Sequence, residues 1–338
     1  MKATDGTTSQ PRSDPRSGEE IARERLLDHL HDALGAEVLD LLADGNVTEL
    51  RVNDDGRVWI TRLGAGRQLT GLGIDEGAAA RVINAVAHSI GLEVGRGNPS
   101  FPAELPGSGY RFHGLMPPVV KRPVFVIRKK PQRVFTLDEY VGNGIMSARQ
   151  AEMLREAVGR RFNILIAGGT DSGKTTLANA ILTEMSRTGD RIITVEDTLE
   201  LICEAEDYVS LRTVPGVRSL RDCLRDVLRM TPDRIVVGEV RGPEVIDMLG
   251  GWNTGHPGGL ATVHANSAGD ALERLEDLVR QGGEVPVPRA LAKAIDLIVF
   301  IRQETCQIDG VPTRQRRISE MLHVDGVDNG EYRYTPLN

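Results

Sequence analysis

Residues 162–177 read FNILIAGGTDSGKTTL and contain residue types at a spacing that can hold a phosphate chain. Gly168, Gly173, Lys174 and Thr175 fit the pattern G-x-x-x-x-G-K-S/T. Glycine lets backbone N–H groups approach phosphate oxygens closely, and a helix that begins near the lysine adds partial positive charge at its N-terminus. The ammonium group would meet the β- and γ-phosphates, and the threonine hydroxyl would bind Mg²⁺. The stretch therefore predicts a site for a nucleoside triphosphate with magnesium.

A strand before this loop and a helix after it are the elements that would position these residues. Residues 163–167 (NILIA) are typical of a short buried strand, and apolar residues recur at helical spacing from Leu177 to Met185. We therefore assign the whole loop to ATP binding: Gly168, Gly169, Thr170, Asp171, Ser172, Gly173, Lys174, Thr175 and Thr176.

Cleavage of the nucleotide also requires groups that serve the metal and the attacking water. Two glutamates follow apolar strands, Glu196 in RIITVEDTLEL and Glu239 in RIVVGEVRGPE. Doubly wound sheets bind ligands at the carboxyl ends of their strands, so both side chains would face the phosphate loop. We predict that Lys174 and both glutamates are catalytic, and that Glu239 faces Mg²⁺ and the water.

The neighbours of these glutamates allow simpler explanations. Asp197 could cap the N-terminus of the next helix, and Arg241 and Glu244 could form an exposed ion pair. His264, in TGHPGGLATVHANS, follows a short strand of small apolar residues, so it could reach the γ-phosphate edge of the site. A lone histidine is more often a hydrogen-bonded structural group, and position alone leaves both roles open.

The composition is that of an ordinary soluble protein long enough for two domains. The chain has 338 residues, 40% of them hydrophobic and 26% charged, with a net charge of -7 and 4% aromatic residues. This balance argues against direct binding of nucleic acid. No apolar run approaches the length of about 18 residues that a membrane span needs, and no apolar signal core follows the N-terminus. We expect a cytoplasmic protein that has no integral membrane segment. Its three cysteines are far apart and read as reduced structural thiols.

The pattern of apolar residues divides the chain into a disordered tail, two domains and a linker. Residues 1–18 are too polar to form a core. An α+β domain is expected over residues 19–130, with helices in 19–43 broken near Gly35, a hairpin turning at 54–56, a helix at 76–90, and strands at 110–115 and 124–128.

A linker is expected at residues 131–146, followed by a larger α/β domain over 147–338. Strands and helices alternate there in the βαβ rhythm of a parallel sheet covered by helices on both faces. The expected elements are a helix at 147–158 and strands at 191–195, 234–237, 260–263 and 297–301. Asp309-Gly310 and Asn329-Gly330 predict hairpins that form a small antiparallel extension.

Six basic residues lie within residues 121–133, a segment without an acid: Lys121, Arg122, Arg128, Lys129, Lys130 and Arg133. The segment is either a solvated strand end and linker or a surface that faces an anion. Because arginine can hold phosphate oxygens with two parallel hydrogen bonds, Arg111 or Arg128 could let the N-terminal domain sense the nucleotide.

Four segments in order resemble the Walker A loop, acidic box, Walker B motif and histidine box of the secretion ATPases of type II and type IV systems. They are GGTDSGKTTL, RIITVEDTLEL, LRMTPDRIVVGEVRG and WNTGHPGGLATVHANS. Upstream, ELPGSGYRFHGLMPPVV followed by VFVIRKK is similar to the N-terminal domain of the conjugal-transfer branch, the TrbB-type ATPases. The resemblance spans roughly residues 20–325 and lacks the four-cysteine metal module of the type II branch.

The resemblance implies a RecA-like P-loop NTPase domain joined to a smaller α+β N-terminal domain. It implies a homohexameric ring ATPase on the cytoplasmic face of the inner membrane, held there by other components of a conjugative type IV secretion system. Such a ring powers pilus assembly or substrate transfer with ATP and Mg²⁺. By the same resemblance His264 senses the γ-phosphate, Thr175 and Glu239 serve the metal, and Arg111 and Arg128 approach the nucleotide.

The chain departs from the family pattern at a few positions. Asp171 stands where the family usually has Gly or Ser, and its charge would lie close to the phosphates. Aspartate tolerates the left-handed conformation that such a loop can require. Thr231 replaces a residue that is often arginine, and Gly250-Gly251 interrupts a predicted helix. If Asp171 made hydrolysis weak, the protein could instead be a nucleotide-gated scaffold of the same apparatus.

Overall fold

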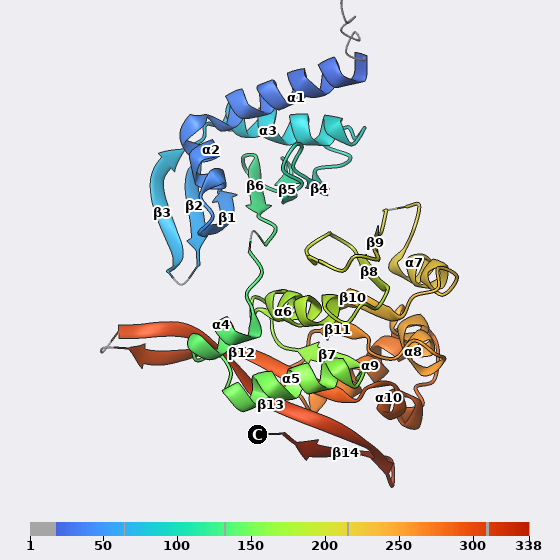
Figure 1. Cartoon of the computed structure of the whole chain (residues 1–338). Coiled ribbons are helices and arrows are strands. Elements are labelled where there is room, and N and C mark those ends of the chain that lie inside the picture. Colours follow the sequence, from blue (N-terminus) through green and yellow to red (C-terminus); the bar gives the residue numbers. More distant parts are fainter. Residues whose placement is uncertain (1–17, 64, 132, 215, 309–310, 338) are drawn as a thin grey trace, which may run out of the picture. The chain divides into compact units, whose positions relative to one another are not determined.

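The computed structural model describes residues 18–63, 65–131, 133–214, 216–308 and 311–337 (Figure 1). The chain splits into two compact units, Met1–Lys130 and Pro131–Asn338, which are described separately here. Apart from Gly18, the tail that the sequence predicts to be disordered lies outside the described residues, as does the predicted Asp309-Gly310 turn.

The first unit packs helices on an antiparallel sheet whose strand order is β3-β2-β1-β6-β5-β4. Helix α3 lies against strands β4 and β6, and α1 packs along α3. The elements are α1 (Gly18–Leu34), α2 (Ala36–Ala43), β1 (Val47–Val52), β2 (Arg57–Arg62), β3 (Gly66–Gly73), α3 (Glu76–Ser89), β4 (Ser100–Glu104), β5 (Arg111–Leu115) and β6 (Val124–Arg128). The predicted helix break is confirmed at Gly35, which has a φ of 78°.

Two strands of the first unit have no counterpart in the sequence prediction. Strands β3 and β4 are the two edges of the sheet. β3 has glycine at three of its eight positions, and β4 contains Pro102, which a sheet tolerates at an edge because the outer N–H need not pair. Their pairing with β2 and β5 holds these segments in place, and a local pattern does not reveal such pairing.

The second unit is built on a mixed sheet with the order β14-β13-β12-β7-β11-β10-β8-β9. Strands from β12 to β9 are parallel, and β13 and β14 add antiparallel. The strands are β7 (Ile164–Ala167), β8 (Ile192–Glu196), β9 (Tyr208–Arg212), β10 (Arg234–Val240), β11 (Leu260–Val263), β12 (Leu297–Ile308), β13 (Val311–Asp328) and β14 (Glu331–Pro336). This confirms the predicted α/β sheet and its antiparallel extension.

Helices cover both faces of this sheet, because two separate apolar clusters line its two sides. The helices are α4 (Leu137–Gly142), α5 (Ala148–Gly159), α6 (Lys174–Ser186), α7 (Leu220–Val227), α8 (Val245–Asn253), α9 (Asp270–Gln281) and α10 (Pro288–Ala294). Helices α5 and α6 lie side by side, while α7, α8, α9 and α10 make up the other layer (Figure 1).

Several segments of the second unit differ from the prediction. The segment 131–146, predicted to be a linker, contains helix α4, which is opened by a reciprocal cap between Thr136 and Glu139 and buries Leu137 and Tyr140 against α5. The edge strand β9 had no predicted counterpart. Helix α8 runs through Gly250 and Gly251 without a break, so the predicted interruption is wrong. A Cβ atom on Gly251 would lie 3.1 Å from side-chain atoms of Ile235 and Leu228, so this glycine permits close packing.

Candidate nucleotide-binding site

The loop 168–173 joins β7 to α6, which confirms the predicted order of strand, loop and helix. Every residue of β7 is buried, and Gly173 caps α6 with a left-handed φ of 100°. A Cβ atom on Gly168 would lie 2.3 Å from the carbonyl oxygen of Ile301 in β12. Only glycine fits at this position, because the neighbouring strand lies directly against the loop.

Lys174 is buried at the start of α6 and turns its ammonium group back over the loop. Its Nζ donates to the carbonyl oxygens of Gly168 at 3.0 Å and Gly169 at 2.9 Å. The same Nζ lies 3.4 Å from Nε2 of His264, which follows β11. The lysine charge is therefore held within the loop, beside the histidine.

Glu239 and His264 meet across the ends of β10 and β11. Nε2 of His264 lies 2.7 Å from Oε1 of Glu239, and the guanidinium of Arg241 pairs with the other carboxylate oxygen. Burial, followed by the charge of Lys174, lowers the pKa of His264 below its usual 6.5, so the imidazole is neutral near pH 7.

Glu196 ends β8 and is almost completely buried, with 2% of its surface exposed. Its Oε1 accepts hydrogen bonds from the backbone N–H groups of Glu200 at 2.9 Å and Leu201 at 3.0 Å. A Cβ atom on Gly238 would lie 2.9 Å from Cγ of Glu196, so this glycine of β10 makes room for the glutamate. Glu196 therefore lies beside Gly238 of the neighbouring strand, and Gly238 directly precedes Glu239.

The two simpler explanations offered for the neighbouring residues are wrong. Asp197 does not cap a helix, because α7 begins later and is capped by Ser219; Asp197 instead accepts a hydrogen bond from Thr213 at 3.1 Å. Arg241 and Glu244 are not an exposed pair. Glu244 is 8% exposed and accepts from the backbone N–H groups of Arg241 at 2.7 Å and Gly242 at 2.8 Å.

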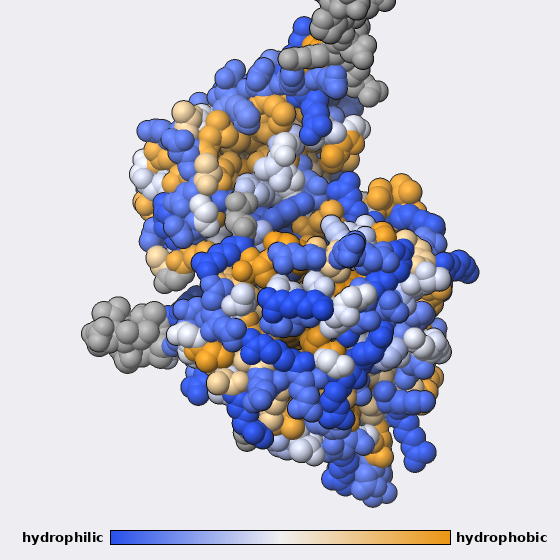
Figure 2. All heavy atoms as spheres, viewed as in Figure 1, coloured by the Kyte–Doolittle hydropathy of each residue, from blue (hydrophilic) through white to orange (hydrophobic). Residues whose placement is uncertain are grey.

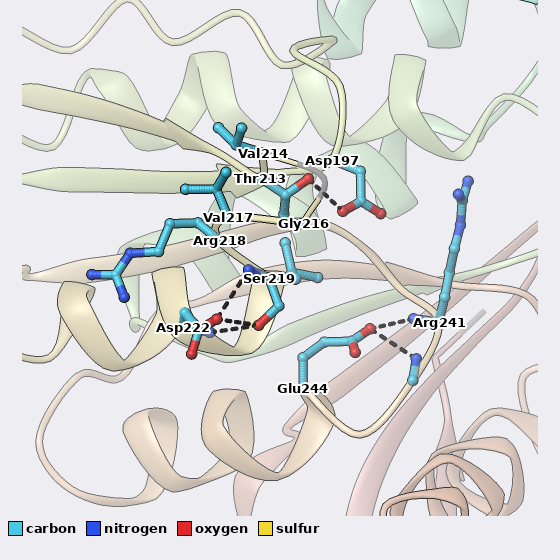
Figure 3. A pocket seen from close by; sticks show the side chains of 12 residues that line it. Asp197, Thr213, Val214, Gly216, Val217, Arg218, Ser219, Asp222, Arg241 and Glu244 are labelled. Carbon is cyan, nitrogen blue, oxygen red and sulfur yellow. Dashed lines mark hydrogen bonds between the residues drawn. The ribbon is translucent and has the colours of Figure 1, made fainter. Parts of the chain in front are cut away.

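An open cavity of about 600 Å³ lies beside this cluster (Figure 3). It is lined by Asp197, Thr213, Val214, Gly216, Val217, Arg218, Ser219, Leu220, Asp222, Arg241, Gly242 and Glu244. Its acids hold the surrounding loops, since Asp197 bonds Thr213, Asp222 bonds Ser219 and Glu244 bonds the segment after β10. The acids that line the cavity therefore hold in place the loops that follow Glu196 and Glu239.

The donor set fits a magnesium nucleotide. The side chains of Thr175 and Glu239 offer oxygen atoms, which Mg²⁺ prefers, and Mg²⁺ usually completes its shell with substrate phosphates and water. Among the described residues there is no cluster of three or more His, Cys, Asp or Glu side chains that would cage a metal without substrate.

Arg111 and Arg128, predicted to approach the nucleotide, belong to the first unit. They are direct neighbours on β5 and β6, and Glu104 on β4 and Glu49 on β1 flank them in the same cross-strand row. The row therefore has two arginines at its centre and one glutamate at each end, so each arginine has an acid as its other cross-strand neighbour.

Three of the six cations in the basic segment 121–133 have partners within the first unit. Burial lowers the pKa of Lys129, whose Nζ donates to the carbonyl oxygen of Asp44 at 2.8 Å. Arg122 pairs with Glu76 at 3.5 Å, and Lys130 with Glu104 at 3.7 Å. These contacts favour a structural explanation for those three cations.

Two further residues of the site were missed by the sequence analysis. Arg241 was considered only as part of an exposed pair, although it comes two residues after Glu239 and so lies on the same side of the strand end. Arg316 of β13 donates to the carbonyl oxygen of Asp171 at 3.4 Å. It is 145 positions away in the sequence, and no local pattern could have brought it to the loop.

A buried lysine on a glycine loop, with glutamates at the ends of the next strands, defines a P-loop ATPase domain. The family model described as "Type II/IV secretion system protein" matches residues 100–330. The chain is 43% identical over 310 residues to "Probable conjugal transfer protein TrbB" of Sinorhizobium fredii, covering 91% of this chain and 92% of the relative. It is 42% identical over 311 residues to "Conjugal transfer protein TrbB" of Rhizobium radiobacter, covering 91% and 93%.

The fold is also similar to that of the pilus retraction motor PilT with bound ADP. The TM-score is 0.60 at 20% identity, covering 89% of this chain and 82% of that one. This chain belongs to the type II/IV secretion ATPase family. Within that family it is a TrbB-type conjugal transfer ATPase, which confirms the resemblance read from its motifs. None of its described helices is long and apolar enough to cross a membrane.

Proposed function

We propose that this chain is a magnesium-dependent, ATP-hydrolysing motor of a conjugative type IV secretion system, working as a homohexamer. The observation that carries the proposal is the linked row of Lys174, His264 and Glu239 at the carboxyl edge of the sheet. The imidazole of His264 lies 3.4 Å from the ammonium group of Lys174 and 2.7 Å from the carboxylate of Glu239. Phosphoryl transfer to water uses a cation that meets the phosphates, an acid that serves the metal and a residue that positions the attacking water.

The residues divide the work by their positions. Backbone N–H groups of the loop 168–176 bind the phosphates, and Lys174 exchanges the carbonyl oxygens of Gly168 and Gly169 for phosphate oxygens. Thr175 and Glu239 hold Mg²⁺, which when bound neutralises charge that builds up on the phosphate oxygens. Buried Glu196 positions the attacking water. His264 senses the γ-phosphate and lies against Glu239.

The wider setting follows from the family. We place the protein on the cytoplasmic face of the inner membrane, bound to other components of the conjugation apparatus and powering pilus assembly or substrate transfer. In the ring, Arg111 and Arg128 would contribute positive charge to the nucleotide. The identity over most of the chain with TrbB proteins supports this setting.

Steady-state phosphate release tests the motor. We expect Lys174→Ala and Glu239→Gln each to lower turnover by about 100-fold or more, because each removes a charge that acts on the transition state. The control is Lys293→Ala, which removes an exposed lysine of α10 and should leave turnover unchanged. If the wild type itself turns over no faster than Lys174→Ala while still binding ATP, the protein is a nucleotide-gated scaffold.

The ring is tested by measuring the mass of the protein in solution with and without ATP and Mg²⁺. A mass six times that of the 36.8 kDa chain is expected in the presence of both. A monomer under every condition would contradict the ring and with it the role of the two arginines. Failure to retain any adenine nucleotide in the presence of magnesium would contradict the proposed function as a whole.

A further inference from the structure

We infer that Arg316 is a positioning residue of the phosphate loop, and that its charge offsets the unusual acid at Asp171. The inference rests on the proposed nucleotide site and adds to it a residue from the C-terminal antiparallel extension. It gives that extension a part in ATP binding.

The sheet carries Arg316 to the loop. Strand β12 lies beside β7, with Phe300 opposite Ala167, the last residue before the loop. Strand β13 pairs with the other side of β12, with Arg316 opposite Gln303. Figure 1 shows β12 and β13 as the long red ribbons of the second unit. Strands β7, β12 and β13 are therefore neighbours in one sheet, and the phosphate loop begins where β7 ends.

The side chain of Arg316 lies directly on the loop. A Cβ atom on Gly173 would lie 2.9 Å from Cδ and 3.1 Å from Nε of this arginine. Its Nη2 donates to the backbone oxygen of Asp171 at 3.4 Å, which is a long hydrogen bond. The half-buried side chain thus spans the loop from Asp171 to the cap of α6.

The rest of β13 holds the arginine in this place. The side chain of Gln315 donates to the carbonyl oxygen of Asn143 at 3.2 Å, and the N–H of Ile318 donates to the carbonyl oxygen of Ile145 at 2.8 Å. Burial raises the pKa of Tyr140 in α4, and the charge of Arg316 acts in the opposite direction. The charge of Arg316 therefore also affects Tyr140, a buried group of the core.

Charge explains why this contact matters here. Asp171 has a φ of 59°, so its residue adopts the left-handed conformation that Gly would adopt without strain. Its carboxylate adds negative charge to a loop that must bind phosphates. Arginine stays protonated at all relevant pH values, and the guanidinium of Arg316, which donates to the backbone oxygen of the same residue, brings the opposite charge to the loop. We infer that the loop tolerates Asp171 because Arg316 compensates for it.

A double-mutant cycle tests the inference, with the dissociation constant of a fluorescent ATP analogue measured in the presence of Mg²⁺. We expect Asp171→Gly alone to bind the analogue more tightly than the wild type. Arg316→Ala should raise the constant about tenfold when Asp171 is present and about twofold or less in the Asp171→Gly background. The matched control is Arg317→Ala, which removes the exposed arginine on the opposite face of β13 and should leave the constant unchanged.

Equal losses from Arg316→Ala in both backgrounds would overturn the inference, because they would mean that the arginine only packs. No loss in either background would overturn it as well. If Arg316→Ala lowers the melting temperature, Arg316→Lys and Arg316→Gln decide the matter: the lysine variant should bind nearly as well as the wild type and the glutamine variant should not. A wild type that binds no analogue contradicts the proposed function, which is a separate result.

Discussion

At the scale of single residues, the site is a row of charged and polar groups that already contact one another. Glu239 lies 2.7 Å from His264 and pairs with Arg241, and Lys174 donates to two carbonyl oxygens of its own loop. Binding a magnesium nucleotide would exchange these internal partners for phosphate and metal. The charged groups of the candidate site are therefore already paired within the protein.

His264 gives a prediction on pH. Burial and Lys174 lower its folded pKa below the unfolded value of 6.5, so the neutral form stabilises the fold. This stability is fully present above about pH 6.5 and is lost as the pH falls through the folded pKa. We expect the free energy of unfolding, measured with urea, to fall more between pH 7.5 and pH 5.5 in the wild type than in His264→Asn.

The comparison between the two proteins removes the contributions of the other histidines, which they share. The same pH dependence in wild type and His264→Asn would show that the imidazole is not held neutral by its surroundings.

At the scale of elements, the apolar periodicity predicted what local sequence determines. The buried run before the phosphate loop became β7, and the helical spacing after it became α6. The edge strands β3, β4 and β9 were missed because pairing with a neighbour, and not their own composition, makes them strands. Helix α4 was missed because it is short and depends on its cap and on burial against α5.

The site was predictable to the same extent. Motif spacing identified Lys174, Glu196, Glu239 and His264, since each follows a strand in the sequence itself. The structure adds what spacing could not give, namely that His264 contacts both Lys174 and Glu239 and that Arg316 reaches the loop from a distant strand. Contacts between separate strands depend on sheet order, which is a property of the fold.

The two glycines of α8 give a prediction at this scale. A Cβ atom on Gly250 would meet nothing within 4 Å, so Gly250→Ala should raise the free energy of unfolding by about 0.5–1 kcal/mol through helix propensity. Gly251→Ala should gain less or lose, because its Cβ atom would press on Ile235 and Leu228. Chemical denaturation of the two variants checks this order, and an equal or larger gain for Gly251→Ala would contradict it.

At the scale of the whole molecule, the charge balance disfavours direct binding of nucleic acid. The chain carries 41 basic and 48 acidic residues, giving a net charge of -7. Figure 2 shows hydrophilic residues over much of the visible face of the second unit, with apolar areas scattered among them. Two cations of the basic segment 121–133, Arg122 and Lys130, pair with acids of their own unit, which offsets their charge.

We therefore expect no retention of single-stranded DNA in a filter-binding assay at physiological salt. Affinity for nucleic acid depends on phosphate contacts and rises steeply as salt falls, so the assay is repeated at low salt as a control. Tight retention at physiological salt would contradict the expectation and would favour a translocase. Arg122→Ala and Lys130→Ala would then show whether the basic segment is responsible.

The contact between Gly168 and β12 has a consequence for how this site tolerates change. The group that faces the glycine is the main-chain oxygen of Ile301, which every amino acid possesses. Replacing Ile301 by another apolar residue therefore leaves the backbone contact behind the loop in place. Position 168 has no such latitude, since a single added methyl group would collide with a peptide bond that cannot be mutated away.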